Sequence, residues 1–171
     1  CSFKNRLYIM YKEPFNTTLR LAWLSNGIWQ GGTPVQEMSG GINPRSSCSP
    51  SLAVFRRKMY ALYKAENSDE LAVAWFNGTT WQGDVAVKSM PGGINPRSSD
   101  SPSLVVFHDH LYAIYKANNG MNLGVARFDG NAWDGDKDGQ KSPRSRFGIQ
   151  STVFKSKVYV AYREVNTNSL C

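Results

Sequence analysis

The chain has 171 residues, with 20 Lys and Arg against 13 Asp and Glu, which gives a formal net charge of +7. Its hydrophobic share of 41% excludes an intrinsically disordered chain, and the lack of any run of about 18 apolar residues excludes a membrane-spanning helix. The basic residues are scattered rather than grouped in a block, so nucleic acid is not the expected partner despite the positive charge.

An internal repeat runs through the whole chain. Aromatic residues recur every 52 positions, as Tyr8, Tyr60 and Tyr112 and as Trp29, Trp81 and Trp133. The octapeptide GGINPRSS occurs unchanged at 40–47 and 92–99. A period of about 50 residues is typical of propellers, solenoids and other arrays. The predicted repeats cover roughly 1–48, 49–100, 101–147 and an incomplete 148–171, within a single partial domain over 1–171.

Each full repeat contains four short β-like runs and no helical pattern. In the second repeat the predicted strands are 51–55, 58–64, 70–76 and 80–87, separated by turn residues. Asn77-Gly78, like Asn26-Gly27, is a dipeptide that tight hairpin turns prefer. The first repeat lacks its first run and the fourth ends after its second. We therefore expect three, four, four and two strands in the four repeats.

The apolar pattern predicts sheets that are covered on both faces. Met59, Ala61 and Tyr63 point to one side of their strand, and Tyr60 and Leu62 point to the other. Repeated four-stranded antiparallel sheets of this kind are the blades of a β-propeller, so the expected fold class is all-β. About three and a half blades do not close a ring. We expect a homodimer or larger homo-oligomer to complete it, with a four-bladed monomer or a fragment of a longer chain as alternatives.

Specific motifs resemble the repeats of β-propeller lectins. The second repeat reads SPSLAVF at 49–55, MYALYK at 59–64 and LAVAWFNG at 71–78, and the third reads SPSLVVF at 101–107 and LYAIYK at 111–116. These motifs are similar to those of the broad group that contains fungal and bacterial fucose-binding propellers and tachylectin-type propellers. The resemblance covers most of the chain. It implies a propeller fold and carbohydrate binding.

Arginines in the loops between repeats are the first candidate ligand-binding residues. Arg45, Arg97 and Arg144 each stand in a Pro-Arg-Ser tripeptide, ten residues before a recurring phenylalanine. A guanidinium offers a rigid fork of donors for sugar hydroxyls or carboxylates. The alternative is that these arginines bond backbone carbonyls and lock neighbouring blades together. Asn43 and Asn95 stand beside two of them and could bind hydroxyls or cap their own turns.

The tryptophans form two groups of candidates, because aromatic faces stack on sugar rings. Trp23 and Trp75 occupy one position of the repeat, where the third repeat has Arg127, and we favour them for ligand contact. Trp29, Trp81 and Trp133 occupy another position, for which packing between blades is the competing interpretation.

The leading hypothesis is a secreted, multivalent lectin that binds glycans through equivalent shallow sites. The sequence shows no paired carboxylates, serine elbow, phosphate-binding loop or metal motif, so we expect no enzyme, no cofactor and no metal. Fucose, galactose and their N-acetyl forms are the expected sugars, on resemblance alone. The alternatives are a protein-binding propeller, such as the targeting module of a toxin or adhesin, and a non-catalytic fragment of a glycosidase.

The cysteines give one further expectation. Cys1 and Cys171 are the first and last residues, which suits a disulfide clasp within one chain or between two chains, although an arbitrary boundary would look the same. Cys48 should then stay unpaired.

Overall fold

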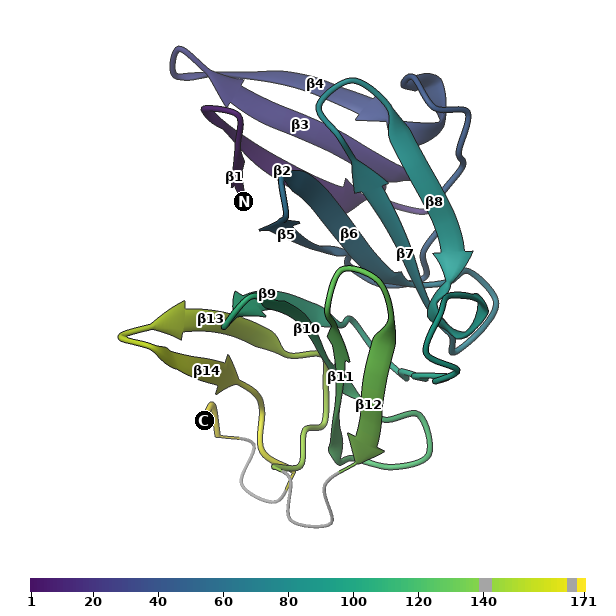
Figure 1. The fold of residues 1–171 in the computed structure, drawn as a ribbon, viewed down its shortest axis with the longest axis vertical. Coiled ribbons are helices and arrows are strands. Elements are labelled where there is room, and N and C mark those ends of the chain that lie inside the picture. Colours follow the sequence, from purple (N-terminus) through teal and green to yellow (C-terminus); the bar gives the residue numbers. More distant parts are fainter. Residues whose placement is uncertain (139–142, 166–168) are drawn as a thin grey trace.

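A computed structural model describes residues 1–138, 143–165 and 169–171 of the chain. The described strands form three four-stranded antiparallel sheets and one two-stranded sheet, and neighbouring strands in each sheet follow one another along the chain. Figure 1 shows the four sheets side by side in an arc, with β1, β5, β9 and β13 on its concave side. This is the arrangement of β-propeller blades, so the predicted fold class is confirmed.

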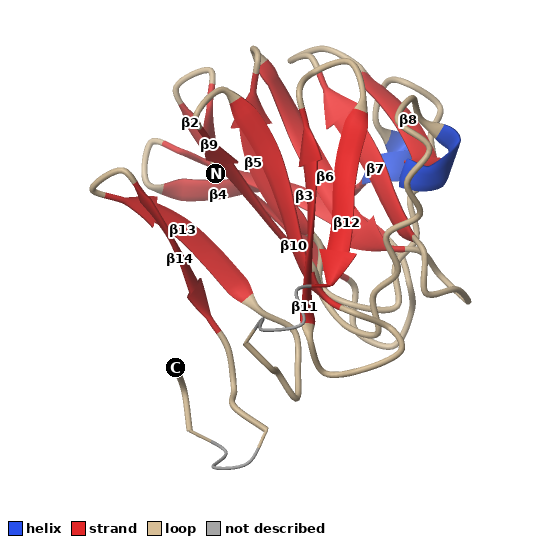
Figure 2. Ribbon diagram, turned by 60° about the horizontal axis from the view of Figure 1, so that its bottom comes forward, coloured by secondary structure: helices blue, strands red, loops and turns tan. Residues whose placement is uncertain are grey.

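The strands have the following bounds. The first sheet contains β1 (Ser2–Phe3), β2 (Arg6–Lys12), β3 (Leu19–Ser25) and β4 (Ile28–Pro34). The second contains β5 (Ser51–Phe55), β6 (Lys58–Lys64), β7 (Leu71–Phe76) and β8 (Trp81–Ala86). The third contains β9 (Ser103–Phe107), β10 (His110–Lys116), β11 (Leu123–Phe128) and β12 (Trp133–Asp138), and the fourth contains β13 (Gln150–Phe154) and β14 (Lys157–Ala161). Two short 3-10 turns, η1 (Val35–Glu37) and η2 (Val87–Ser89), follow β4 and β8, and Figure 2 shows them beside the strands.

The strands of the second repeat agree with the prediction to within a residue at each end. The prediction of three strands in the first repeat is wrong, because β1 completes that sheet. Ser2 and Phe3 pair with Leu7 and Arg6, and a strand of two residues is too short to leave an alternating pattern in the sequence. The limits of the repeats themselves stay a prediction.

Aromatic residues join each sheet to the next. The rings of Phe3 and Phe76 meet edge-on with centroids 6.2 Å apart, and those of Phe55 and Phe128 repeat this contact at 6.3 Å between the second and third sheets. Such a pair contributes about 0.5–1.5 kcal/mol beyond the burial of its area. The phenylalanines that end β1 and β5 therefore hold the following sheet.

Serine hydroxyls link the inner strands along the concave side of the arc. The Oγ of Ser51 accepts a hydrogen bond from the backbone N–H of Leu104 at 2.9 Å, and the Oγ of Ser103 accepts one from that of Ser151 at 2.9 Å. These bonds satisfy backbone donors at sheet edges that face one another, where no strand pairing is available. The second serine of each SPS motif thus has a structural role, as an acceptor for the backbone of the next sheet.

Two-residue hairpin turns connect the first two strands of every sheet and also β3 with β4. Asn26-Gly27 adopts the left-handed backbone that its sequence predicts, with φ of 51° and 75°. Arg56 and Arg57 adopt the same geometry without glycine, at φ of 44° and 61°. The Arg56 guanidinium lies over the Phe55 ring, 5.2 Å from its centroid.

The two ends of the chain are held separately. The backbone of Cys1 pairs with Tyr8 and that of Cys171 pairs with Tyr162. All three cysteines are free thiols. The predicted clasp between Cys1 and Cys171 is therefore not formed within this chain, since each end is tied to its own sheet, and a clasp between two chains stays a prediction.

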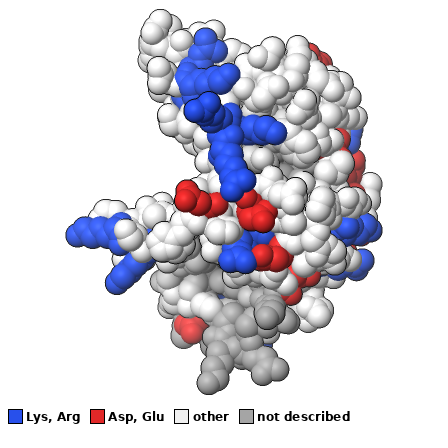
Figure 3. Space-filling view, in the orientation of Figure 1, with Lys and Arg blue, Asp and Glu red and all other residues white. Residues whose placement is uncertain are grey.

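The charged side chains are unevenly spread over the surface. Figure 3 shows basic side chains in a stripe over the upper part of the molecule, with acidic side chains below its lower end, and a hollow on the concave side of the arc.

Within the described residues, no helix is long and apolar enough to cross a bilayer.

Candidate functional site

The three Pro-Arg-Ser segments lie where one sheet meets the next. Arg45 forms a β-bridge with Thr18, at the start of β3, and the neighbouring Ser46 forms one with Ala65, just after β6. The segments that contain Arg97 and Arg144 repeat this pattern at the next two junctions. Each segment therefore crosses from one sheet to its neighbour and is fixed to both.

The serine of each segment is the residue that locks the junction. Ser98 is fully buried, and its Oγ lies 2.7 Å from the carbonyl oxygen of Asp100 and 3.0 Å from that of Lys116. Ser46 and Ser145 are buried and bonded in the same way. The backbone carbonyls at each junction are thus bonded by these serines, whereas the prediction had assigned a lock of this kind to the arginines.

The side chain of Arg97 stays accessible at its junction. Half of it is exposed, and its Nη1 lies 3.3 Å from Oδ2 of Asp69 while its Nη2 lies 3.8 Å from Oε1 of Glu70. Ion pairs this open to water contribute about 0–1 kcal/mol to stability. The pairing therefore orients the guanidinium without committing it to the core.

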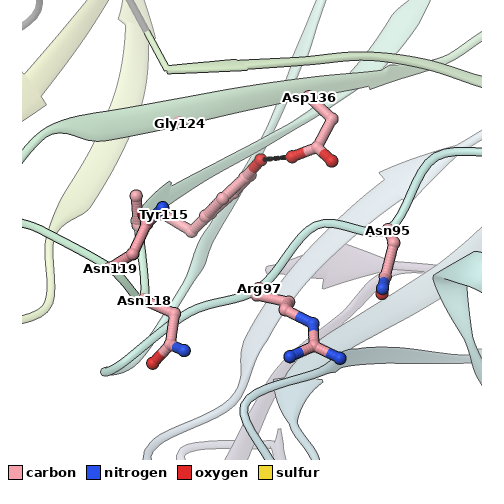
Figure 4. Close-up of a pocket in the computed structure, with 8 residues that line it drawn as sticks. Asn95, Arg97, Tyr115, Asn118, Asn119, Gly124 and Asp136 are labelled. Atoms are coloured by element: carbon pink, nitrogen blue, oxygen red, sulfur yellow. Dashed lines mark hydrogen bonds between the residues drawn. The ribbon is translucent and has the colours of Figure 1, made fainter.

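A cavity of about 340 Å³ opens beside Arg97, between the second and third sheets. This volume is in the range of about 300–1,000 Å³ that small ligands occupy. Figure 4 shows Asn95 and Arg97 on the connecting loop facing residues of the third sheet. The cavity is lined by Asn95, Arg97, Tyr115, Ala117, Asn118, Asn119, Gly124 and Asp136. A guanidinium, a carboxylate and three amides thus converge in one small space.

A tyrosine–aspartate pair forms the floor of the cavity. The buried Tyr115 donates its hydroxyl hydrogen to Oδ1 of Asp136, and Figure 4 shows this bond. Asp136 has a left-handed backbone, φ 59°, next to the irregular pairing between β11 and β12 that turns its side chain toward the tyrosine. Gly124 lies against the ring, and an ideal Cβ built there would come within 2.5 Å of it.

The junction between the first and second sheets carries a related but different set. Tyr63 donates to Asp84 as Tyr115 does to Asp136, and burial followed by this bond raises the pKa of the Tyr63 hydroxyl above its ordinary value. The two junctions differ in the residues beside the arginine. Thr17 stands at the position of Asp69 and Glu66 stands at that of Asn118, so the acid occupies the second of these positions instead of the first. Thr17 donates to Glu66 at 2.7 Å and accepts from Arg45 at 3.3 Å.

The third arginine lies in a poorer environment. The Nη2 of Arg144 lies 4.0 Å from the sulfur of Met121, which occupies the position of Asp69. Among the described residues, the fourth sheet has no β12-like strand to supply an aspartate opposite Tyr162. The three predicted arginine sites are therefore not equivalent.

The predicted tryptophans lie away from this cavity. Trp75 is at the far end of β7 from Glu70 and Arg97, and four to five residues of extended strand span about 13–17 Å. Trp23 has the same place in β3, and both are only partly exposed. Trp75 donates to Gln82 at 2.9 Å, and the ammonium group of Lys58 lies 5.7 Å from the centroid of its ring.

The second group of tryptophans divides by burial. Trp81 and Trp133 are 1% exposed, with their backbone N–H groups bonded to the preceding loop at Ser39 and Pro91. Their rings are enclosed between sheets, which supports the packing interpretation over ligand contact. Trp29 is 49% exposed, although it occupies the same position of the repeat.

The predicted asparagines lie at the junctions. Asn95 lines the cavity, and the backbone N–H of Asn43 donates to Asp84 at 3.3 Å. Asp69, Asn118 and Asn119 were not predicted from the sequence, because they do not recur in every repeat. The tyrosine and the Trp-x-Gly-Asp motif do recur, and their common period was the signal that could have identified the floor of the cavity. No cluster of His, Cys, Asp or Glu that could hold a metal is found in the described part of the chain.

No protein-family model and no curated protein matches the sequence. Solved structures do match in fold. A variant of the Aleuria aurantia lectin in complex with Fucα1-6GlcNAc has a TM-score of 0.63 and 12% identity, and the match covers 96% of this chain and 52% of that one. A Trypanosoma rangeli sialidase in complex with the inhibitor DANA has a TM-score of 0.61 and 12% identity over 91% of this chain and 26% of that one. Zg3597, a family 117 glycoside hydrolase from Zobellia galactanivorans, has a TM-score of 0.63 and 16% identity, and the match covers 90% of this chain and 50% of that one.

These likenesses concern the fold, and the chain spans about half the length of the matched lectin and hydrolase chains. The resemblance to β-propeller lectins is confirmed at that level. The prediction that the protein is not an enzyme is contradicted, because a sialidase and several glycoside hydrolases match as well as the lectins do. The lack of a recognisable catalytic motif in the sequence was an insufficient reason to separate these classes.

Proposed function

We propose that the protein binds carbohydrate at the junction between its second and third sheets. The observation that carries this proposal is the polar cavity beside Arg97, in a fold shared with saccharide-binding proteins. Sugar hydroxyls both donate and accept hydrogen bonds. The guanidinium of Arg97 supplies donors, the carboxylate of Asp136 supplies acceptors, and the amides of Asn95 and Asn118 supply both.

The junction between the first and second sheets supports a second site in the same chain. It keeps the arginine, the asparagine and the tyrosine–aspartate pair, as Arg45, Asn43, Tyr63 and Asp84. Thr17 replaces the acid Asp69 and Glu66 replaces the amide Asn118, which presents a different order of donors and acceptors, so the two sites should differ in the sugar they prefer. Two sites on one chain would make the protein multivalent. We propose that the protein acts outside the cell. Fucose, galactose and their N-acetyl forms are the first ligands to test.

Replacing Arg97 with alanine is expected to weaken binding at the second junction by about tenfold to a hundredfold, because losing a hydrogen bond to a charged group costs about 1.5–3 kcal/mol. A glycan array would choose the sugar, and titration calorimetry would measure its dissociation constant for wild type and Arg97→Ala. Arg57→Ala is the matched control, since Arg57 is an exposed arginine of a hairpin turn outside the cavity.

Three outcomes of this experiment decide the proposal. Loss of affinity in Arg97→Ala with the control unchanged supports it. Binding of no glycan by the wild type, or equal affinity in all three proteins, contradicts it. Release of nitrophenol from nitrophenyl glycosides by the wild type would instead identify an enzyme.

Gly124→Ala should weaken the same site without a change of charge. The added Cβ would displace the Tyr115 ring and reshape the floor, and crowding of this kind costs about 1–3 kcal/mol. We expect calorimetry to show affinity about tenfold lower, which corresponds to about 1.4 kcal/mol. Ala72→Gly is the reverse change at the equivalent position of the junction between the first and second sheets, and it should leave the site beside Arg97 intact. Equal affinity in Gly124→Ala and wild type would mean that the ligand does not reach the floor.

A further inference from the structure

The first sheet leaves bare the face that its counterparts bury. In the second and third sheets this face receives the preceding sheet, and its residues are at most 2% exposed: Met59, Ala61, Tyr63 and Trp81, then Leu111, Ala113, Tyr115 and Trp133. In the first sheet the same positions are between 36% and 49% exposed: Leu7, Ile9, Tyr11 and Trp29. A groove of about 490 Å³ runs along Ile9, Tyr11 and Trp29. We call these four residues of the first sheet the receiving face.

The fourth sheet leaves bare the opposite kind of face. Phe55 and Tyr60 of the second sheet are buried where they pack against the third, and Phe3 and Tyr8 of the first pack against the second in the same way. The equivalent residues of the fourth sheet are exposed: 58% for Phe154 and 48% for Tyr159. We call Phe154 and Tyr159 the inserting face. Figure 1 shows the first and fourth sheets at the two ends of the arc.

A cation next to the phenylalanine adds a second, polar element to the contacts between the first and second and between the second and third sheets. The Nζ of Lys4 lies over the Phe3 ring and occupies the space that a side chain on Gly78 would need. Arg56 lies over Phe55 and fills the space next to Gly130 in the same way. In both contacts the cation therefore lies against a glycine in the turn of the following sheet.

The inserting face carries the phenylalanine and the cation of such a contact, and the receiving face carries a turn that no sheet covers. Lys155 lies over the Phe154 ring, 5.3 Å from its centroid, as Lys4 and Arg56 do over theirs. The corresponding turn of the first sheet is Asn26-Gly27, with Asn26 at the position of Gly78, and no described atom lies within 4 Å of a Cβ built on Gly27. One end of the chain therefore presents a phenylalanine and cation, and the other presents an uncovered Asn-Gly turn beside an exposed tryptophan.

We propose that the inserting face of one copy of the chain packs on the receiving face of a second copy, with Lys155 at the Asn26-Gly27 turn and Phe154 beside Leu24, which pairs with Leu7 of the receiving face. A second copy is the occupant that the molecule itself specifies, because the same pairing of residues is made twice within the chain. The contact is head-to-tail. It produces a closed ring where the rotation between copies closes, and otherwise an open chain of copies.

The test uses one charged substitution on each face. Light scattering after size exclusion at micromolar concentration should give wild type a mass of at least two chains. Trp29→Asp and Phe154→Asp should each be monomeric, because each lacks one half of the contact. An equimolar mixture of the two variants should form a dimer of two chains and nothing larger, because only the intact inserting face of one and the intact receiving face of the other can meet.

The control is Phe15→Asp, which changes a fully exposed phenylalanine outside both faces and should keep the mass of wild type. Circular dichroism of each variant should match wild type, which separates failed association from failed folding. A monomeric wild type overturns the proposal. So does an association that survives in either single variant, since the faces would then not pair head to tail. None of these results depends on whether the cavity beside Arg97 binds sugar.

Discussion

Gly92→Ala is expected to lower the free energy of unfolding by about 3 kcal/mol or more, which is among the largest effects that a single methyl group can have. Gly92 has φ of 120° and lies against the backbone of Trp133, whose N–H bonds to the Pro91 carbonyl at 2.8 Å. A Cβ there would overlap the carbonyl oxygen of Trp133, and that backbone cannot yield without opening β12. The same loop carries Asn95 and Arg97, so ligand binding should be lost with the packing.

Gly93→Ala is the matched control for this prediction. Gly93 also has positive φ, at 69°, but no described atom lies within 4 Å of a Cβ built on it. Its replacement should cost only the strain of a left-handed alanine, about 1–2 kcal/mol. Urea denaturation of both variants measures the difference. Equal losses of stability in the two would mean that the close approach of the loop to Trp133 does not exist.

Trp133→Ala should destabilise the protein by about 3–5 kcal/mol, the usual cost of emptying the space of a buried large aromatic residue. Trp133 is enclosed between the second and third sheets, with the Phe128 ring 5.1 Å away between centroids. Trp29→Ala changes the same position of the repeat where it is half exposed, and it should cost about 1 kcal/mol or less.

Urea denaturation of the two tryptophan variants should be recorded at protein concentrations low enough to keep wild type monomeric, so that association does not contribute. A large loss for Trp29→Ala under those conditions would show that the first sheet is covered within a single chain. A small loss for Trp133→Ala would contradict the enclosed packing of the third sheet.

Most of the candidate site was not predictable from the repeat. Periodicity identified Arg97 and Asn95, which recur, and it could not identify Asp69 or Asn118, which are replaced by Thr17 and Glu66 at the first junction. Residues that make two junctions different are absent from a shared pattern by definition. The recurrence of Pro-Arg-Ser also had two causes that sequence could not separate, since the buried serine locks the junction while the arginine stays half exposed.

The tryptophans show a limit of a different kind. Trp23 and Trp75 were grouped with the arginines because both residue types suit sugar binding. Each tryptophan, however, lies toward the end of its strand, whereas the arginine of that junction lies beside the start of the strand. Chain spacing along a repeat does not say which end of a blade a residue reaches, because strands reverse direction at every turn. Trp29, Trp81 and Trp133 are indistinguishable by position, and only the presence or absence of a neighbouring sheet separates them.

The sequence by itself determined the local structure of this protein. Alternation of apolar residues, hairpin dipeptides and a period of 52 residues specify strands, turns and blades, because these signals act between residues close in the chain. The tertiary structure alone decided what lies between blades: the cavity beside Arg97, the enclosure of Trp133 and the bare faces at both ends of the arc. Each of these arises where segments about fifty residues apart meet, and the packing of two surfaces depends on both of them together.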